Sequence, residues 1–196
     1  MDARTQSALD LGWRLVAATL SRLGALVGRS WLPGSVWSRA FAELRRAEAA
    51  ARRLLVVLAG SVPLKAVPAT GQACIHPVKH RAGGMGGRGF SLFDTLPDLA
   101  FERCEGTEAP SDPATIFHST AGLAARLKAL AALADNPSPA IRRMALWLAR
   151  RCGPRTSPLR PGGPPGVGVD LMDLDCDVVL QCDLCARERL NRPAPP

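Results

Sequence analysis

Apolar residues near the start of the chain recur with the spacing of an amphipathic helix. Steps of four and three residues alternate between six of them: Leu9, Trp13, Val16, Leu20, Leu23 and Val27. At 100° per residue these side chains fall on one narrow stripe, and three arginines lie on the opposite side: Arg14, Arg22 and Arg29. The pattern predicts a helix with one buried face that ends before Pro33-Gly34.

A second helix is predicted after this break, from Ser35 as its N-cap to about Ala59. Its expected buried stripe is Trp37, Phe41, Leu44, Ala51, Leu55 and Leu58. Glu48 and Arg52 stand four residues apart, a spacing that predicts a surface ion pair worth about 0.2–0.5 kcal/mol. Residues 1–60 are therefore expected to form a helical hairpin.

Two further helices are predicted in the second half of the chain. Asp112-Pro113 supplies an N-cap acceptor followed by proline at the first helical position, and Asn136-Pro137 ends this third helix. Its expected buried residues are Ile116, Leu123, Leu127 and Leu130. Ser138-Pro139 repeats the start signal for a fourth helix that runs to about Arg151. The short connection predicts antiparallel neighbours, so residues 112–152 are expected to form a second hairpin that packs with the first.

The remaining segments lack a helical period. Residues 61–111 are punctuated by proline and glycine and are expected to be irregular and partly disordered, and residues 153–169 form a Pro/Gly linker. Residues 170–196 form a cysteine-containing tail, with five Asp and no basic residue between positions 170 and 183. Such a tail can fold back onto a basic body, but solvated disorder is the expectation. The predicted fold is all-α, with about four amphipathic helices and a flexible C-terminal tail.

Charge widens the range of partners without selecting one. The formal net charge is +8, and almost all of the 25 basic residues are arginine. This bias, together with abundant Ala, Gly and Pro, is typical of a bacterium with a GC-rich genome. The predicted fourth helix nevertheless carries a basic face that suits phosphates of lipid or nucleic acid: Arg142, Arg143, Arg150 and Arg151. No recognised nucleic-acid-binding pattern accompanies it.

A glycine fingerprint at residues 84–89 has the form G-x-G-x-x-G found in dinucleotide-binding folds. That motif must follow a buried strand and open a helix, whose N-terminal N–H groups then hold the pyrophosphate. Polar residues and a proline precede these glycines, and no helical period follows them. The context favours a glycine-rich loop over a cofactor site.

The C-terminal cysteines are the sharpest chemical signal. Cys182 and Cys185 form a C-x-x-C motif that can turn two thiolates onto one zinc ion, and Cys176 can add a third sulfur. The candidates for a fourth ligand are Cys74, His76 and His80. The competing interpretation is free thiols in a mobile tail, and no other cofactor is expected.

No catalytic motif stands out among the three histidines and the carboxylates, so an enzyme is not expected. The N-terminal segment lacks a signal-peptide pattern, and no apolar run is long enough to span a bilayer, which predicts a cytoplasmic protein, with peripheral membrane attachment left open. The first hypothesis is a small regulatory protein that binds a protein partner through an apolar helical surface. The alternatives are an arginine-driven membrane or nucleic-acid binder and a zinc-binding module.

Overall fold

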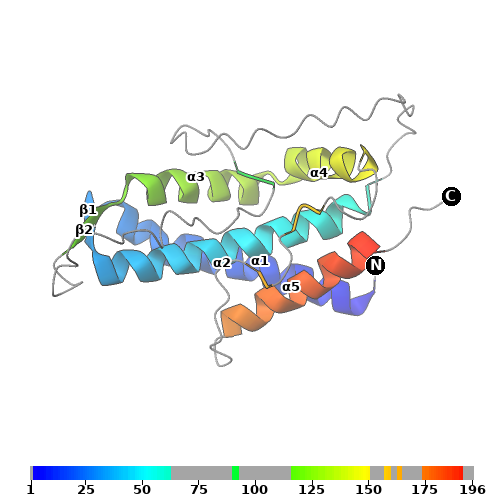
Figure 1. Cartoon of the computed structure of the whole chain (residues 1–196), viewed down its shortest axis with the longest axis horizontal. Coiled ribbons are helices and arrows are strands. Elements are labelled where there is room, and N and C mark those ends of the chain that lie inside the picture. Colours follow the sequence, from blue (N-terminus) through cyan, green and yellow to red (C-terminus); the bar gives the residue numbers. More distant parts are fainter. Residues whose placement is uncertain are drawn as a thin grey trace, which may run out of the picture.

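The structure, a computed structural model, describes residues 2–62, 90–92, 116–150, 157–159, 163–164 and 174–191. It is mostly helical, with one small antiparallel ribbon (Figure 1). In chain order the elements are α1 (Ala3–Val27), β1 (Trp31–Pro33), α2 (Gly34–Ala59), β2 (Phe117–Ser119), α3 (Ala121–Asp135), α4 (Ser138–Arg150) and α5 (Leu174–Asn191). None of the described helices is long and apolar enough to cross a bilayer.

The first hairpin is present, with α1 and α2 running in opposite directions (Figure 1). Asp2 caps α1 by accepting a hydrogen bond from the backbone N–H of Thr5 at 2.7 Å. Three members of the predicted α1 stripe are buried in the core, namely Leu9, Val16 and Leu23. The seven-residue period that they share keeps one face of α1 against α2.

Helix α2 is the centre of the bundle. It contacts α1 and α5 on one side and α3 and α4 on the other (Figure 1). Every residue from Ala47 to Val57 is buried, because neighbours cover this stretch on all sides. The predicted surface position of Glu48 and Arg52 is therefore wrong: both are buried, with 5% and 3% of their surface exposed.

The predicted third helix begins later than its sequence signals indicate. Residues 117–119 form β2, which pairs with β1, and α3 starts at Ala121. The proposed start at Asp112-Pro113 lies outside the described residues. Pairing with β1 draws this segment into an extended conformation, so the local helix signal loses to a tertiary contact.

The predicted second hairpin is also wrong. Figure 1 shows α3 and α4 following one another in the same direction along the bundle. Asn136 between them has an extended backbone, with φ −142° and ψ 84°, and does not reverse the chain. Helix α3 packs on α1 and α4 packs on α2. The 25- and 26-residue helices of the first hairpin offer a surface long enough for both shorter helices, of 15 and 13 residues, placed end to end.

The predicted flexible tail contains an ordered helix. Helix α5 packs along α1 and α2 (Figure 1). Its buried residues are Cys176, Val179, Cys182, Asp183, Cys185 and Ala186. Asp175 and Asp177 lie in its first turn and Arg189 in its last, as the helix dipole favours. The expectation of a disordered tail fails for residues 174–191 because small apolar and thiol side chains, spaced three and four residues apart, complete the core.

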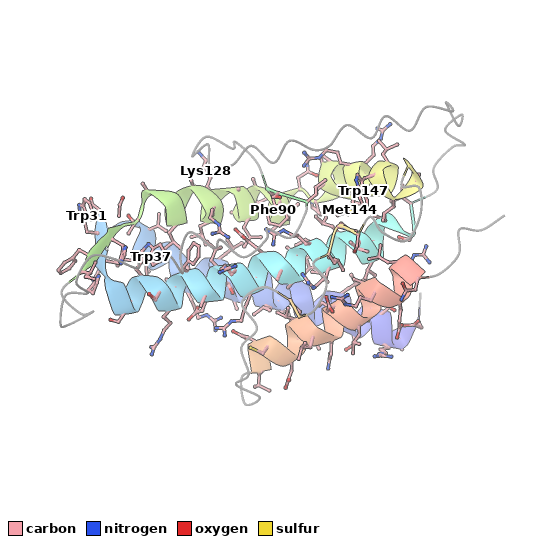
Figure 2. The ribbon with its side chains drawn as sticks, in the orientation of Figure 1. Trp31, Trp37, Phe90, Lys128, Met144 and Trp147 are labelled. Carbon is pink, nitrogen blue, oxygen red and sulfur yellow. The ribbon has the colours of Figure 1, made fainter. Side chains whose placement is uncertain are left out.

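Most of the predicted irregular segment 61–111 and of the linker 153–169 lies outside the described residues. The parts that are described contact the bundle: Phe90 and Leu92 pack against the core, and Leu159 is buried in it. Figure 2 shows Phe90 between the layer of α3 and α4 and the layer of α2.

Candidate functional site

The ribbon of β1 and β2 closes one end of the bundle, opposite the start of α1 and the end of α5 (Figure 1). Trp31 pairs with Ser119, Leu32 with His118 and Pro33 with Phe117. The Oγ1 of Thr120 donates to the carbonyl oxygen of Arg29 at 2.5 Å, and its backbone N–H donates to that of Ser30 at 3.2 Å. These bonds tie the turn after α1 to the start of α3. We call this end of the molecule, residues 28–41 and 116–122, the tip.

The outer face of the tip exposes large apolar side chains. Alternation along a strand places Trp31 and Phe117 on one face of the ribbon and Leu32 and His118 on the other. Trp31 and Phe117 are each 59% exposed, and Val36 and Ile116 are also exposed. In this register Trp31 and Phe117 are diagonal cross-strand neighbours, within reach of each other for aromatic side chains. Figure 2 places Trp31 at the extreme end of the bundle.

The inner face of the tip is a stack of rings. Leu32 is fully buried. The His118 ring stacks on Trp37 with centroids 4.8 Å apart, and Trp37 stacks on Phe41 at the same spacing. The guanidinium of Arg126 lies over the Phe41 ring, 4.7 Å from its centroid. Aromatic stacking and a cation over the ring face are each favourable, so the ribbon that carries Trp31 and Phe117 packs on a well-stabilised layer of side chains, which we call the ring stack.

A buried carboxylate links the ring stack to the middle of the bundle. Glu48 accepts from Nε of Arg126 at 2.9 Å and from Nη2 of the same residue at 2.5 Å. It also accepts from Arg52 at 3.2 Å. Arg52 in turn donates to the Ser91 carbonyl at 3.0 Å and lies 5.2 Å from the Phe90 ring centroid. This network joins α3 to α2, and within it the buried charges of Glu48 and Arg52 both have partners, as buried charges require.

The charge of the tip has one sign. Residues 28–41 and 116–122 contain Arg29 and Arg39 and no Asp or Glu. Both arginines are exposed. Among the described residues neither one is within ion-pair distance of a carboxylate. The tip thus combines an aromatic surface with two arginines that no carboxylate of the described residues neutralises.

The three predicted metal ligands all lie on α5, but Cys182 and Cys176 contact different neighbours. Cys182 meets the backbone of α1, with its Sγ 3.4 Å from the Ala8 carbonyl oxygen, and Cys176 lies 3.8 Å from a guanidinium nitrogen of Arg46. The described residues hold no group of three His, Cys, Asp or Glu side chains placed to bind a metal ion. The fourth-ligand candidates Cys74, His76 and His80 lie outside the described residues. The zinc site stays a prediction.

Burial governs the chemistry of these thiols. Burial raises the pKa of Cys182 from 9.0 to about 12, with a further contribution from neighbouring Cys185. Burial likewise raises the pKa of Cys185. Burial therefore disfavours the thiolate form, which is the form that acts as a nucleophile. Their environment is that of core residues.

The predicted basic face of α4 is described in part. Arg142 and Arg143 are exposed on this helix. The side chain of Arg150 and the whole of Arg151 lie outside the described residues, as does the glycine fingerprint at residues 84–89. Helix α2 also carries several arginines, but it exposes Arg39 at its start and buries Arg53 completely. Its arginines therefore do not form one continuous surface.

Sequence reasoning missed the tip. Trp31 stands in a stretch that reads as a helix break, and Phe117 in a stretch that reads as a helix. The available signal was a large aromatic beside Pro33-Gly34 that belonged to neither helical stripe. Comparison of the chain with protein-family models, curated proteins and solved structures gives no significant match.

Proposed function

We propose that this chain is a non-enzymatic binding protein that attaches to anionic membrane surfaces through its tip. The observation that carries the proposal is that two exposed aromatic side chains, Trp31 and Phe117, share the tip with two exposed arginines, Arg29 and Arg39, for which the described part of the chain supplies no carboxylate partner. Aromatic rings are favoured at the boundary between headgroups and acyl chains, and exposed apolar patches of this kind mark interaction sites.

The charge of the tip supports an anionic bilayer over a neutral one. A basic residue near an anionic leaflet contributes about 1 kcal/mol, so Arg29 and Arg39 together would contribute about 2 kcal/mol. The same charge disfavours a second copy of the tip as the partner, because the arginines of both copies would then meet. Attachment with a binding free energy of this size is reversible, and it weakens as salt screens the charge of the arginines.

The position of the tip sets the orientation of the attached molecule. Because the ribbon lies at one end of the long axis (Figure 1), the bundle would stand end-on and carry α4 and α5 away from the lipid. At 1.5 Å per residue, the 26 residues of α2 reach about 39 Å. The proposed role is that of an attached protein that holds its far end at a distance from the bilayer.

The test is cosedimentation of the full chain with phosphatidylcholine vesicles, with and without phosphatidylserine, at low and high salt. Binding is expected only with the anionic lipid. The double variant Trp31→Ala/Phe117→Ala should abolish it. Arg29→Gln/Arg39→Gln should weaken it by roughly thirtyfold, the equivalent of about 2 kcal/mol.

Matched controls come from the same chain. Arg142→Gln/Arg143→Gln removes two exposed charges from α4 and gives the same net charge as the tip variant. Leu180→Ala/Leu184→Ala removes two exposed apolar side chains from α5. Both controls should bind as the wild type does. Equal loss in Arg142→Gln/Arg143→Gln would instead support the arginine-driven alternative, and salt-sensitive binding of duplex or single-stranded oligonucleotides by that face would identify a nucleic-acid binder.

A further inference from the structure

Helix α5 has a second apolar face that points away from the bundle. Its inner side is buried against α1 and α2, yet three leucines on the helix remain exposed: Leu174 at 79%, Leu180 at 37% and Leu184 at 50%. A helix that packs on one side only is expected to be polar on the other. Within the described residues, the exposed leucines of α5 have no covering element.

Two of these leucines lie between acidic residues on one stripe. Asp177, Leu180, Leu184 and Glu188 are separated by steps of three, four and four residues, so they share one side of the helix. We call these four residues the outer face of α5. Asp177 and Glu188 are exposed, and the two carboxylates are separated by 11 positions, about 16 Å along the helix axis.

The acidic ends of the outer face remain available to a ligand. Glu188 lies 3.4 Å from Arg4, but both side chains are more than half exposed, so this ion pair is weak and open to exchange. Asp177 has no ion-pair partner among the described residues. Residues 170–183 carry five Asp and no basic residue, although the chain as a whole has a net charge of +8. Of these five, Asp177 is exposed on the outer face of α5, whereas Asp183 is buried beside Arg53 and Asp175 pairs with Arg22. The outer face therefore carries its negative charge at its two ends, Asp177 and Glu188.

We infer that the outer face of α5 binds a basic amphipathic helix of a partner protein. In this mode the partner places apolar side chains over Leu180 and Leu184, and its Lys or Arg residues, about 11 positions apart, meet Asp177 and Glu188. The site is separate from the tip and does not depend on lipid. Together with the proposed attachment it would make the chain an adaptor between a membrane and a helical partner.

Charge excludes a second copy of α5 as the occupant. Two outer faces packed in antiparallel orientation would bring Asp177 of one copy to Glu188 of the other. Parallel packing would bring each carboxylate to its own counterpart. Like charges facing one another across a helix pair are repulsive in both arrangements, whereas a basic helix is attracted in either.

The experiment measures fluorescence anisotropy of a labelled synthetic peptide titrated with the full chain in the absence of lipid. The probe is a helical leucine–lysine heptad peptide, and its control has Glu at every Lys position. The wild type should bind the lysine peptide and not the glutamate peptide. The overall positive charge of the chain repels the lysine peptide, so binding reports a local acidic site.

Variants assign the site. Leu180→Ala/Leu184→Ala and Asp177→Asn/Glu188→Gln should each weaken binding at least tenfold, and Asp177→Lys/Glu188→Lys should bind the glutamate peptide instead. The matched control Asp10→Asn/Asp135→Asn neutralises two exposed acids on α1 and α3 and should bind as the wild type does. Absence of lysine-peptide binding, equal loss in the control variant, or self-association that Leu180→Ala/Leu184→Ala abolishes would each overturn the inference. None of these variants changes a residue of the tip. A negative result in the peptide assay therefore leaves the proposed membrane attachment standing, and a negative vesicle assay leaves the peptide site standing.

Discussion

Arg53 of α2 donates from Nε to Oδ1 of Asp183 on α5 at 2.7 Å, inside the protein core. The Arg53 side chain is fully buried and also donates to the Ala49 carbonyl oxygen at 3.0 Å. The other oxygen of Asp183 accepts from Arg187 at 2.5 Å. The arrangement makes α5 an integral part of the core, because Arg53 and Asp183 are both buried where α2 and α5 meet.

Removing one partner of this pair should destabilise the protein strongly. Asp183→Asn removes the carboxylate charge that Arg53 faces in the core, and breaking a buried ion pair costs about 3–5 kcal/mol. Urea denaturation followed by circular dichroism measures the loss. The double variant Arg53→Met/Asp183→Leu should be less destabilised than Asp183→Asn, because it removes both charges and keeps apolar volume.

The exposed pair of Arg4 and Glu188 on the same two-helix contact is the control. Glu188→Gln should change the unfolding free energy by about 0.5 kcal/mol or less. If Asp183→Asn were as mild as Glu188→Gln, the interpretation of α5 as part of the core would be wrong.

The sequence predicted the long helices of the first half well and the rest less well, for identifiable physical reasons. The α1 stripe of Leu9, Val16 and Leu23 has one buried side, and one-sided burial is what periodicity detects. Arg53 carries no such signal: a charge on a helix normally indicates a solvated face, and only the distant Asp183 makes its burial tolerable. Contacts between residues 130 positions apart are invisible to local pattern.

A close approach of three helices at Gly12 supplies the second prediction. A Cβ at this position would lie 2.8 Å from Cδ2 of Leu54 and 2.9 Å from Sγ of Cys182, and both of those side chains are buried. Gly12→Ala should therefore destabilise the protein by about 1–3 kcal/mol through overpacking. Thermal unfolding monitored by circular dichroism gives the size and sign.

Gly24 lies in the same helix and provides the opposite expectation. A Cβ there would meet nothing within 4 Å. Gly24→Ala should stabilise the protein by about 0.5–1 kcal/mol, because alanine loses less conformational freedom in a helix. A stabilising Gly12→Ala would show that α1, α2 and α5 do not meet at this point.

The thiol of Cys182 makes stability sensitive to alkaline pH. Burial raises the pKa of Cys182 to about 12 in the folded protein, against 9.0 as its ordinary value, so the folded state holds this proton more tightly than the unfolded state does. The associated stability is complete below pH 9 and is lost as the pH rises from 9 to about 12, at up to about 1.4 kcal/mol per pH unit.

Comparison with Cys182→Ala isolates this group. The variant should be less stable near neutral pH because it leaves a small cavity. Between pH 9 and 12, however, its urea midpoint should fall less steeply than that of the wild type. Parallel slopes for the two proteins would mean that Cys182 is accessible to water in the folded state.

The candidate binding surface depended on residues that the sequence does not bring together. Trp31 and Phe117 are 86 positions apart and become neighbours only through a ribbon three residues long on each strand. Short strands between long helices carry little periodic signal. The exposed leucines of α5 could not be predicted for another reason. Leu180 and Leu184 stand between or beside the buried residues Val179 and Cys182 in the sequence, so apolar residues lie on both sides of the helix and show no one-sided period.

Thr120 offers a test of whether the tip acts as a preformed surface. Its hydroxyl donates to the Arg29 carbonyl oxygen at 2.5 Å and lies 3.2 Å from that of Ser30, at the point where the turn after α1 joins β1. Thr120→Val keeps the shape of the side chain and removes its donor, so the turn after α1 loses the hydroxyl bond while the backbone bond from Thr120 to Ser30 remains. The unfolding free energy should fall by about 1–2 kcal/mol, whereas vesicle binding should weaken several-fold because Trp31 and Phe117 are no longer held side by side. Thr120→Ser retains the hydroxyl and should restore both properties. If Thr120→Val bound anionic vesicles as tightly as the wild type, a preformed pair would not be needed for binding. Either aromatic side chain would then be sufficient by itself, and the single variants Trp31→Ala and Phe117→Ala would each keep most of the binding.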